Sequence, residues 1–200
     1  MSTSAPIPVR ERRRQQTRAE ILEAAWRLGE RDGIAGLSLR ELAGEVGMRP
    51  PSLYTYFDSK AAIYDAMFAQ GYRELDAMEA ALELDPDDPV GALERSIEAF
   101  VDFCCASVAR FQLMFTRAVP GWEPSPEAYA VSVASNERSV AELERLGIDE
   151  PWHFDLMTAL FAGLASQQLA NDPGGDRWRR LSREAAEMYV THVLHGRRQP

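Results

Sequence analysis

The sequence predicts an all-α fold, with a head of short helices followed by a larger helical body. Apolar residues recur at three- and four-residue spacing in nearly every segment, and no stretch of useful length alternates as a strand does. Hydrophobic residues make up 46% of the 200 residues and charged residues 26%, which is ordinary for globular proteins and argues against a disordered or fibrous chain. No apolar run approaches the roughly 18 residues that span a bilayer, and no apolar stretch follows the basic N-terminus as in a secretory signal. We therefore expect a cytoplasmic protein.

Four helices are predicted in the first 84 residues. The segments Thr17–Glu20 and Ser38–Glu41 have the pattern of capping boxes and are expected to begin the first two helices. Gly33 and Gly47 follow the apolar residues of these helices, as C-terminal glycines do. A short third helix is expected over 50–56, because prolines suit the first turn of a helix.

The fourth helix and the helices of the body follow from the same signals. Asp58 and Ser59 are expected to cap a helix over 59–84, about 39 Å long at about 1.5 Å per residue. The segment 85–89 carries two prolines and marks a boundary. Beyond it, helices are predicted over 90–108, 109–118, 127–146, 151–170 and 176–194.

Charge divides the chain into a basic head and an acidic body. The formal net charge is −9, but residues 1–60 hold ten Lys and Arg against eight Asp and Glu, while residues 61–200 hold twelve against twenty-three. An acidic surface repels the phosphates of DNA. Any contact with nucleic acid is therefore expected from the head alone.

The head contains a predicted helix-turn-helix, in which a turn at Gly47 separates two short helices. At 100° per residue, Leu53 and Phe57 fall together on the second of these helices and are expected to face the core. Polar and aromatic side chains share the opposite arc, and Tyr54 lies at its edge. The outward arc comprises Pro51, Ser52, Thr55 and Tyr56.

This segment resembles the DNA-binding domain of the TetR family of transcriptional regulators, over about residues 17–70. The resemblance is carried by Ala24-Ala25, Ser38 to Ala43, Gly47, Ser52-Leu53-Tyr54, Tyr56-Phe57 and Ser59-Lys60, while Pro50-Pro51 and Thr55 depart from the family pattern. The resemblance implies a homodimeric regulator, most simply a repressor released by a small molecule, that binds a near-palindromic operator in double-stranded DNA.

The resemblance also implies roles for individual residues. Arg40 matches a position that reads a base or a phosphate, Ser52 and Tyr54 match recognition-helix contacts, and Lys60, the sole lysine of the chain, matches a phosphate contact. The complete set of expected DNA-binding residues is Arg40, Arg49, Pro51, Ser52, Tyr54, Thr55, Tyr56 and Lys60.

Three parts of the chain are expected on this basis. Residues 1–16 form a basic N-terminal arm, residues 17–60 form the helix-turn-helix domain, and residues 61–200 form a helical domain that binds a ligand and dimerises. The helix over 59–84 links the last two parts.

The body has more large aromatic residues than helix packing requires, and ligand pockets are largely apolar. The candidate ligand-binding residues are Phe103, Phe111, Met114, Phe115, Trp122, Tyr129, Trp152, His153, Met157 and Phe161. Polar candidates are Arg110, Arg117, Arg138, His153 and Gln167.

A two-fold dimer is expected through the helices over 151–170 and 176–194, because small residues let two helices approach closely. The candidate interface residues are Ala159, Gly163, Ser166, Gln167, Ala185 and Met188.

The chain has no recognisable catalytic motif, so an enzyme is not expected, nor is a cofactor or a metal site. Cys104 and Cys105 are adjacent and exclude a disulfide framework. Two alternatives stay open: a helical interaction module that docks an acidic protein, and a helical enzyme without a cofactor. A gel shift on DNA distinguishes the first from a regulator, and chemical change of a bound small molecule identifies the second.

Overall fold

The computed structural model describes residues 8–195, and within that range the chain has helices and no strand. Residues 1–7 of the expected arm and the last five residues of the expected dimerisation domain lie outside the described range. The α-helices are α1 (Val9–Asp32), α2 (Leu39–Glu45), α3 (Pro50–Leu53), α4 (Lys60–Ala80), α5 (Pro89–Cys105), α6 (Val108–Phe115), α7 (Pro126–Arg145), α8 (Pro151–Asn171) and α9 (Ser182–Val190). Short helical turns lie after α1 at Ile34–Gly36, before α9 at Arg179–Leu181 and after α9 at Thr191–His195. The predicted all-α class is confirmed.

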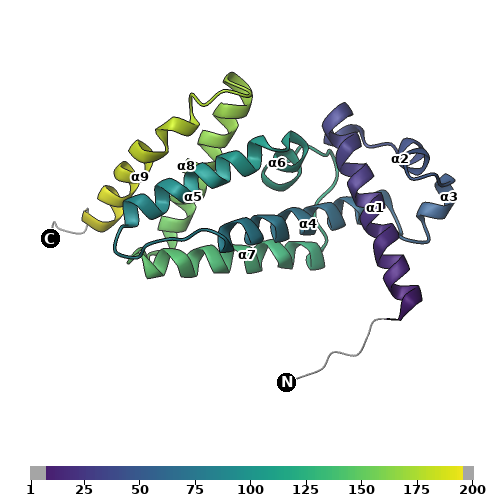
Figure 1. Ribbon diagram of the computed structural model, residues 1–200, viewed down its shortest axis with the longest axis horizontal. Coiled ribbons are helices and arrows are strands. Elements are labelled where there is room, and N and C mark those ends of the chain that lie inside the picture. The colour runs from purple at the N-terminus through teal and green to yellow at the C-terminus, as the bar shows by residue number, and fades with distance from the viewer. Residues whose placement is uncertain (1–7, 196–200) are drawn as a thin grey trace.

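The head and the body lie at opposite ends of the molecule (Figure 1). The helices α1, α2 and α3 form the head, and α4 runs from it into the body alongside α7. The helix α5 packs against α8 and α9, which lie at the end away from α3. None of the helices within residues 8–195 is long and apolar enough to cross a membrane.

The first helix begins nine residues earlier than the sequence predicts. It starts after Pro8, so Thr17 lies inside the helix and the prediction that it caps the N-terminus is wrong. The segment 9–16 is rich in Arg, Glu and Gln, which favour helix. Gln15 also donates to Glu11 at 3.3 Å, one turn away. The described part of the expected arm is therefore a helical extension.

The two serine caps occur as predicted. Ser38 accepts the backbone N–H of Glu41 at the start of α2, and Ser59 accepts that of Ala62 at the start of α4. Other bounds differ from the expected ones. The helix α3 spans four residues, and α4 ends at Ala80, four residues before the expected end at 84. The helix expected over 176–194 is divided into two short turns and α9.

The head is fixed to the body by polar contacts as well as packing. The Tyr64 hydroxyl on α4 donates to the carbonyl of Ile34 at 2.9 Å, and burial raises the pKa of this phenol to about 12. The Glu30 carboxylate at the end of α1 accepts the N–H of Ala109 at 3.1 Å and the Ser107 hydroxyl. Glu30 thereby satisfies free groups at the start of α6, which couples α1 to the body.

Candidate nucleic-acid interface and ligand cavity

The turn between α2 and α3 has the backbone geometry of a helix-turn-helix. Gly47 has a φ of +68°, in the region that favours glycine. The N–H of Met48 donates to the carbonyl of Ala43 at 2.7 Å and closes the end of α2. Arg49 then caps α3 with extended backbone, as a residue before proline does.

The third helix and the turn after it present the face that the sequence predicts. Leu53 and Phe57 are 1% and 3% exposed, which confirms that they point into the core of the head. Tyr54 is 53% exposed. Arg49, Pro51, Ser52 and Thr55 are also exposed, and Tyr56 is half-buried.

Arg40 and Lys60 lie in the first turns of α2 and α4, the helices that precede and follow α3 in the chain. Arg40 is exposed in the first turn of α2. Lys60 is the first residue of α4 and is half-buried, and its Nζ lies 5.4 Å from the centre of the Tyr64 ring. A cation at a helix N-terminus is unfavourable with the helix dipole, so an external anion would stabilise Lys60.

Arg18 is a residue of this site that the sequence analysis missed. Its guanidinium donates to the carbonyl of Tyr56 and lies over the Phe57 ring, with Cζ 4.0 Å from the ring centre. Burial, and then the nearby charge of Arg14, lower the pKa of Arg18. The contact joins residues 38 positions apart, so local patterns do not reveal it. It holds α1 against the turn that follows α3.

A basic face extends from this contact along the start of α1. Arg10, Arg14 and Arg18 recur every four residues and fall within about 80° of arc on one face of the helix. Arg10 and Arg14 are exposed. Because Arg18 contacts the turn after α3, this face continues outward from the side of α1 next to that turn.

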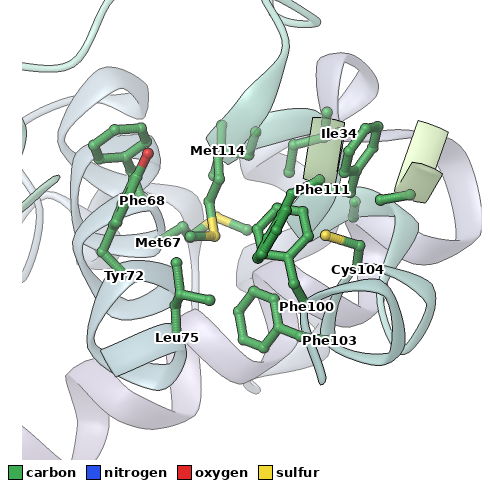
Figure 2. Packing of buried hydrophobic residues seen from close by; sticks show 14 of the residues in the cluster. Ile34, Met67, Phe68, Tyr72, Leu75, Phe100, Phe103, Cys104, Phe111 and Met114 are labelled. Atoms are coloured by element: carbon green, nitrogen blue, oxygen red, sulfur yellow. The ribbon is translucent and has the colours of Figure 1, made fainter. Parts of the chain in front are cut away.

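Several expected ligand-binding residues are packed into the core between α4, α5 and α6. Phe103, Phe111 and Met114 are each 7–8% exposed and point into one cluster with Tyr72 (Figure 2). The ring of Phe115 lies 5.2 Å from that of Phe100, between centres. These side chains belong to the hydrophobic core or pack against it, and their contact with a ligand stays a prediction.

Trp122 is also engaged within the chain. Its indole N–H donates to Asp65 at 3.1 Å, and its ring packs at 5.6 Å on that of Tyr64 and at 5.9 Å on that of Phe68. It therefore ties the loop before α7 to α4.

The remaining aromatic candidates have different surroundings. Tyr129 and Trp152 are 57% and 47% exposed, on α7 and α8. His153 is buried, and its Nδ1 accepts the N–H of Glu150 at 3.1 Å, while its carbonyl accepts the Tyr189 hydroxyl at 2.8 Å. His153 thus stabilises the start of α8.

A cavity of about 520 Å³ lies between α4, α5, α7 and α8. Of the ten candidate ligand-binding residues, Met157 and Phe161 line this cavity. The full lining is Asp76, Glu79, Ala80, Leu82, Leu84, Leu93, Ser96, Arg138, Ser139, Ala141, Glu142, Leu143, Arg145, Leu146, Met157 and Phe161. Its size is within the range of small-molecule sites.

The polar candidates are divided between this cavity and other places. Arg138 lines the cavity and forms an ion pair with Asp76. Arg110 lies elsewhere, where it binds Glu74 at 2.8 Å and the carbonyl of Phe103 at 2.6 Å. Arg117 and Gln167 are exposed on the surface.

The outer face of α8 and α9 carries five of the six expected dimer residues. Ala159, Gly163, Ser166 and Gln167 are exposed on α8, and Met188 on α9 is 62% exposed. The sixth differs: Ala185 is 7% exposed and packs mainly in the chain's own core. The exposed side chains of Trp152 and Leu156 extend the same apolar face of α8.

Comparison with known proteins agrees with this geometry. The sequence model described as "Bacterial regulatory proteins, tetR family" matches residues 21–67, which include the whole helix-turn-helix. The HTH-type transcriptional regulator Rv1816 of Mycobacterium tuberculosis is 30% identical over 122 residues, which are 58% of this chain and 51% of the relative. EthR of Mycolicibacterium smegmatis is 36% identical over 83 residues, 41% of this chain and 38% of the relative. The chain thus spans about half or less of the length of these curated relatives.

Solved structures share the complete fold. The putative regulatory protein SCO4313 superposes with a TM-score of 0.71 at 23% identity, covering 92% of this chain and 99% of that one. RolR, solved in complex with resorcinol, superposes with a TM-score of 0.57 at 15% identity, covering 90% and 95%. Residues 21–67 of the chain are thus a helix-turn-helix domain of the tetR family type, and the chain as a whole has the fold of these solved structures.

Proposed function

We propose that the protein is a DNA-binding transcriptional regulator, most simply a repressor that acts as a homodimer in the cytoplasm and leaves its operator when a small molecule binds. The observation that carries this proposal is the exposed arc of α3, which projects from the basic head of a chain that is otherwise acidic. An α-helix on such a projection enters the major groove of DNA.

The exposed residues divide into those that contact bases and those that contact phosphates. Ser52 and Thr55, with Pro51 and Tyr56 on the same outward arc and Tyr54 at its edge, meet base edges or the sugar–phosphate backbone. Arg40 meets a base or a phosphate, and Arg49 and Lys60 meet phosphates. The basic face of α1 supplies further phosphate contacts beside α3.

Two heads are brought to one operator by the outer face of α8 and α9. Two-fold pairing through this face buries its exposed apolar side chains and places two recognition helices about one DNA turn, roughly 34 Å, apart. A dimer of this kind requires a near-palindromic operator.

The cavity supplies the means of control. The helix α4 begins with Lys60, soon after α3 ends at Leu53, and its other end lines the cavity, so one helix runs from the DNA-binding head to the cavity. A ligand that fits better when α4 takes another position opposes DNA binding, and DNA opposes the ligand equally. RolR, which shares this fold, is solved in complex with resorcinol, and this supports the binding of a small molecule by the body.

Selection of bound sequences from a random pool of duplex DNA tests the proposal. We expect enrichment of one sequence with two inverted half-sites, and loss of binding as salt rises. An interaction module that docks an acidic protein enriches no sequence. The enzyme alternative is tested separately, because an enzyme changes a small molecule chemically on incubation, whereas an effector is recovered intact.

A further inference from the structure

The walls of the cavity between α4, α5, α7 and α8 differ sharply in character. Every charged residue that lines it comes from α4 or α7. The helices α5 and α8 contribute Leu93, Ser96, Met157 and Phe161. A molecule that fits this space therefore meets charge on one side and apolar surface on the other.

The charges of the polar wall do not cancel. Three carboxylates line the cavity against two guanidinium groups, and both guanidinium groups are already engaged. Arg138 pairs with Asp76, which also accepts the Ser135 hydroxyl at 2.6 Å. Arg145 pairs with Glu142 at 2.6 Å. The third carboxylate, Glu79, is therefore the excess charge of the cavity.

Glu79 is half-buried and has an incomplete set of partners. The Ser139 hydroxyl donates to its Oε2 at 3.2 Å, and no ion pair among the described residues includes Glu79. Burial is the main cause that raises its pKa, and the neighbouring Asp76 and Glu142 raise it further, against Ser139 and Arg138, which lower it. A carboxylate in this position is stabilised by a cation or by additional hydrogen-bond donors.

We propose, on the basis that this cavity is the effector site of the regulator described above, that its ligand is a small amphipathic monocation. The ammonium group of the ligand lies against Glu79, and its hydrocarbon part lies against Leu93, Met157 and Phe161. An anionic ligand of the same shape is excluded, because it meets an acidic wall whose two arginines are neutralised.

Three probes of one shape test the charge preference: 4-phenylbutylamine, 4-phenylbutan-1-ol and 4-phenylbutanoate, each titrated into the full chain by calorimetry. The amine is expected to bind at least about tenfold more tightly than the alcohol, equivalent to about 1.4 kcal/mol. The carboxylate is expected to bind more weakly than both. Equal or tighter binding of the alcohol or the carboxylate, or no heat from the amine, overturns the proposal.

Two variants locate the effect. In Glu79→Gln, which keeps the size of the side chain, the preference for amine over alcohol is expected to fall to less than about threefold, or about 0.7 kcal/mol. The matched control is Glu83→Gln, since Glu83 is exposed just after the end of α4 and does not line the cavity. It should keep the full preference. Ala141→Trp, at an exposed lining residue, should weaken the amine and the alcohol alike.

The same titrations separate this proposal from the proposed function. With operator DNA from the random-pool selection, the amine is expected to weaken DNA binding. An amine that binds through Glu79 but leaves operator affinity unchanged supports the charge preference of the cavity and refutes its role as effector site. If the alcohol binds more tightly than the amine and weakens operator binding, the cavity is the effector site but its preference for a cation is refuted.

Discussion

Replacing Arg18 by methionine tests whether a contact between α1 and the turn after α3 holds the recognition helix in place. The guanidinium of Arg18 donates to the Tyr56 carbonyl and stacks on the Phe57 ring. Methionine keeps much of the aliphatic packing and removes both interactions. The segment 54–57 then loses its link to α1 and opens more often.

The magnitude follows from these two interactions. A hydrogen bond from a charged group contributes about 1.5–3 kcal/mol, and a cation over an aromatic ring at an exposed site about 0.5–1 kcal/mol. Because Arg18 is half-buried, solvent screens part of both, and we expect a loss of about 2 kcal/mol in the local free energy of opening. Since a tenfold change in an equilibrium corresponds to about 1.4 kcal/mol, opening becomes about 30-fold more frequent.

Hydrogen exchange measures this opening directly. The N–H groups of Tyr56 and Phe57 donate to the carbonyl of Leu53 at 2.8 and 2.9 Å, so their exchange reports whether the end of α3 is intact. Arg18→Met should accelerate exchange at both amides by about 30-fold. Arg27→Met is the matched control, since Arg27 is an exposed arginine of the same helix, and it should change exchange by no more than about twofold. If the two variants exchange alike at these amides, Arg18 does not hold the recognition helix.

Three further predictions concern DNA, assembly and pH. Lys60→Ala should reduce the slope of log DNA affinity against log salt concentration by about 0.9, because one phosphate contact is lost. The control variant Arg117→Ala, in the body, should leave the slope unchanged. An unchanged slope in Lys60→Ala would show that Lys60 does not contact DNA. Gly163→Arg should fold, since no atom of the chain lies within 4 Å of the position of a Cβ at Gly163. Light scattering should show a monomer, and operator binding should be lost. A variant that is a dimer and binds DNA contradicts the assignment of the dimer interface to α8. Urea unfolding over a series of pH values tests Glu79, whose raised pKa means that ionisation in the folded state is unfavourable. The protonated Glu79 side chain is tolerated at a pH below its ordinary pKa, and the folded protein loses stability as the pH rises from the ordinary pKa to the raised one. The free energy of unfolding of Glu79→Gln should therefore increase relative to that of the wild type between these two pKa values, and the difference should stay constant at higher pH. A difference that is independent of pH shows that the pKa is not raised.

The sequence by itself determined the helical class, the helix-turn-helix and the division of charge. These properties depend on local chemistry: the serine caps at Ser38 and Ser59, the glycine at Gly47, and the spacing that turns Leu53 and Phe57 inward. Each is decided by residues within one or two helical turns. A reading of neighbouring residues is therefore sufficient to predict them.

Tertiary structure alone decided where the apolar residues of the body go. Periodicity shows that Phe111 and Met157 face inward, but not that Phe111 fills the core while Met157 lines a cavity. That outcome depends on which helices meet and how completely their side chains fill the space between them. The same holds for Glu79, whose surroundings come from α4 and α7, and for Arg18, whose partner lies 38 residues away. Contacts between distant segments arise when the chain closes on itself, so a local pattern does not contain them.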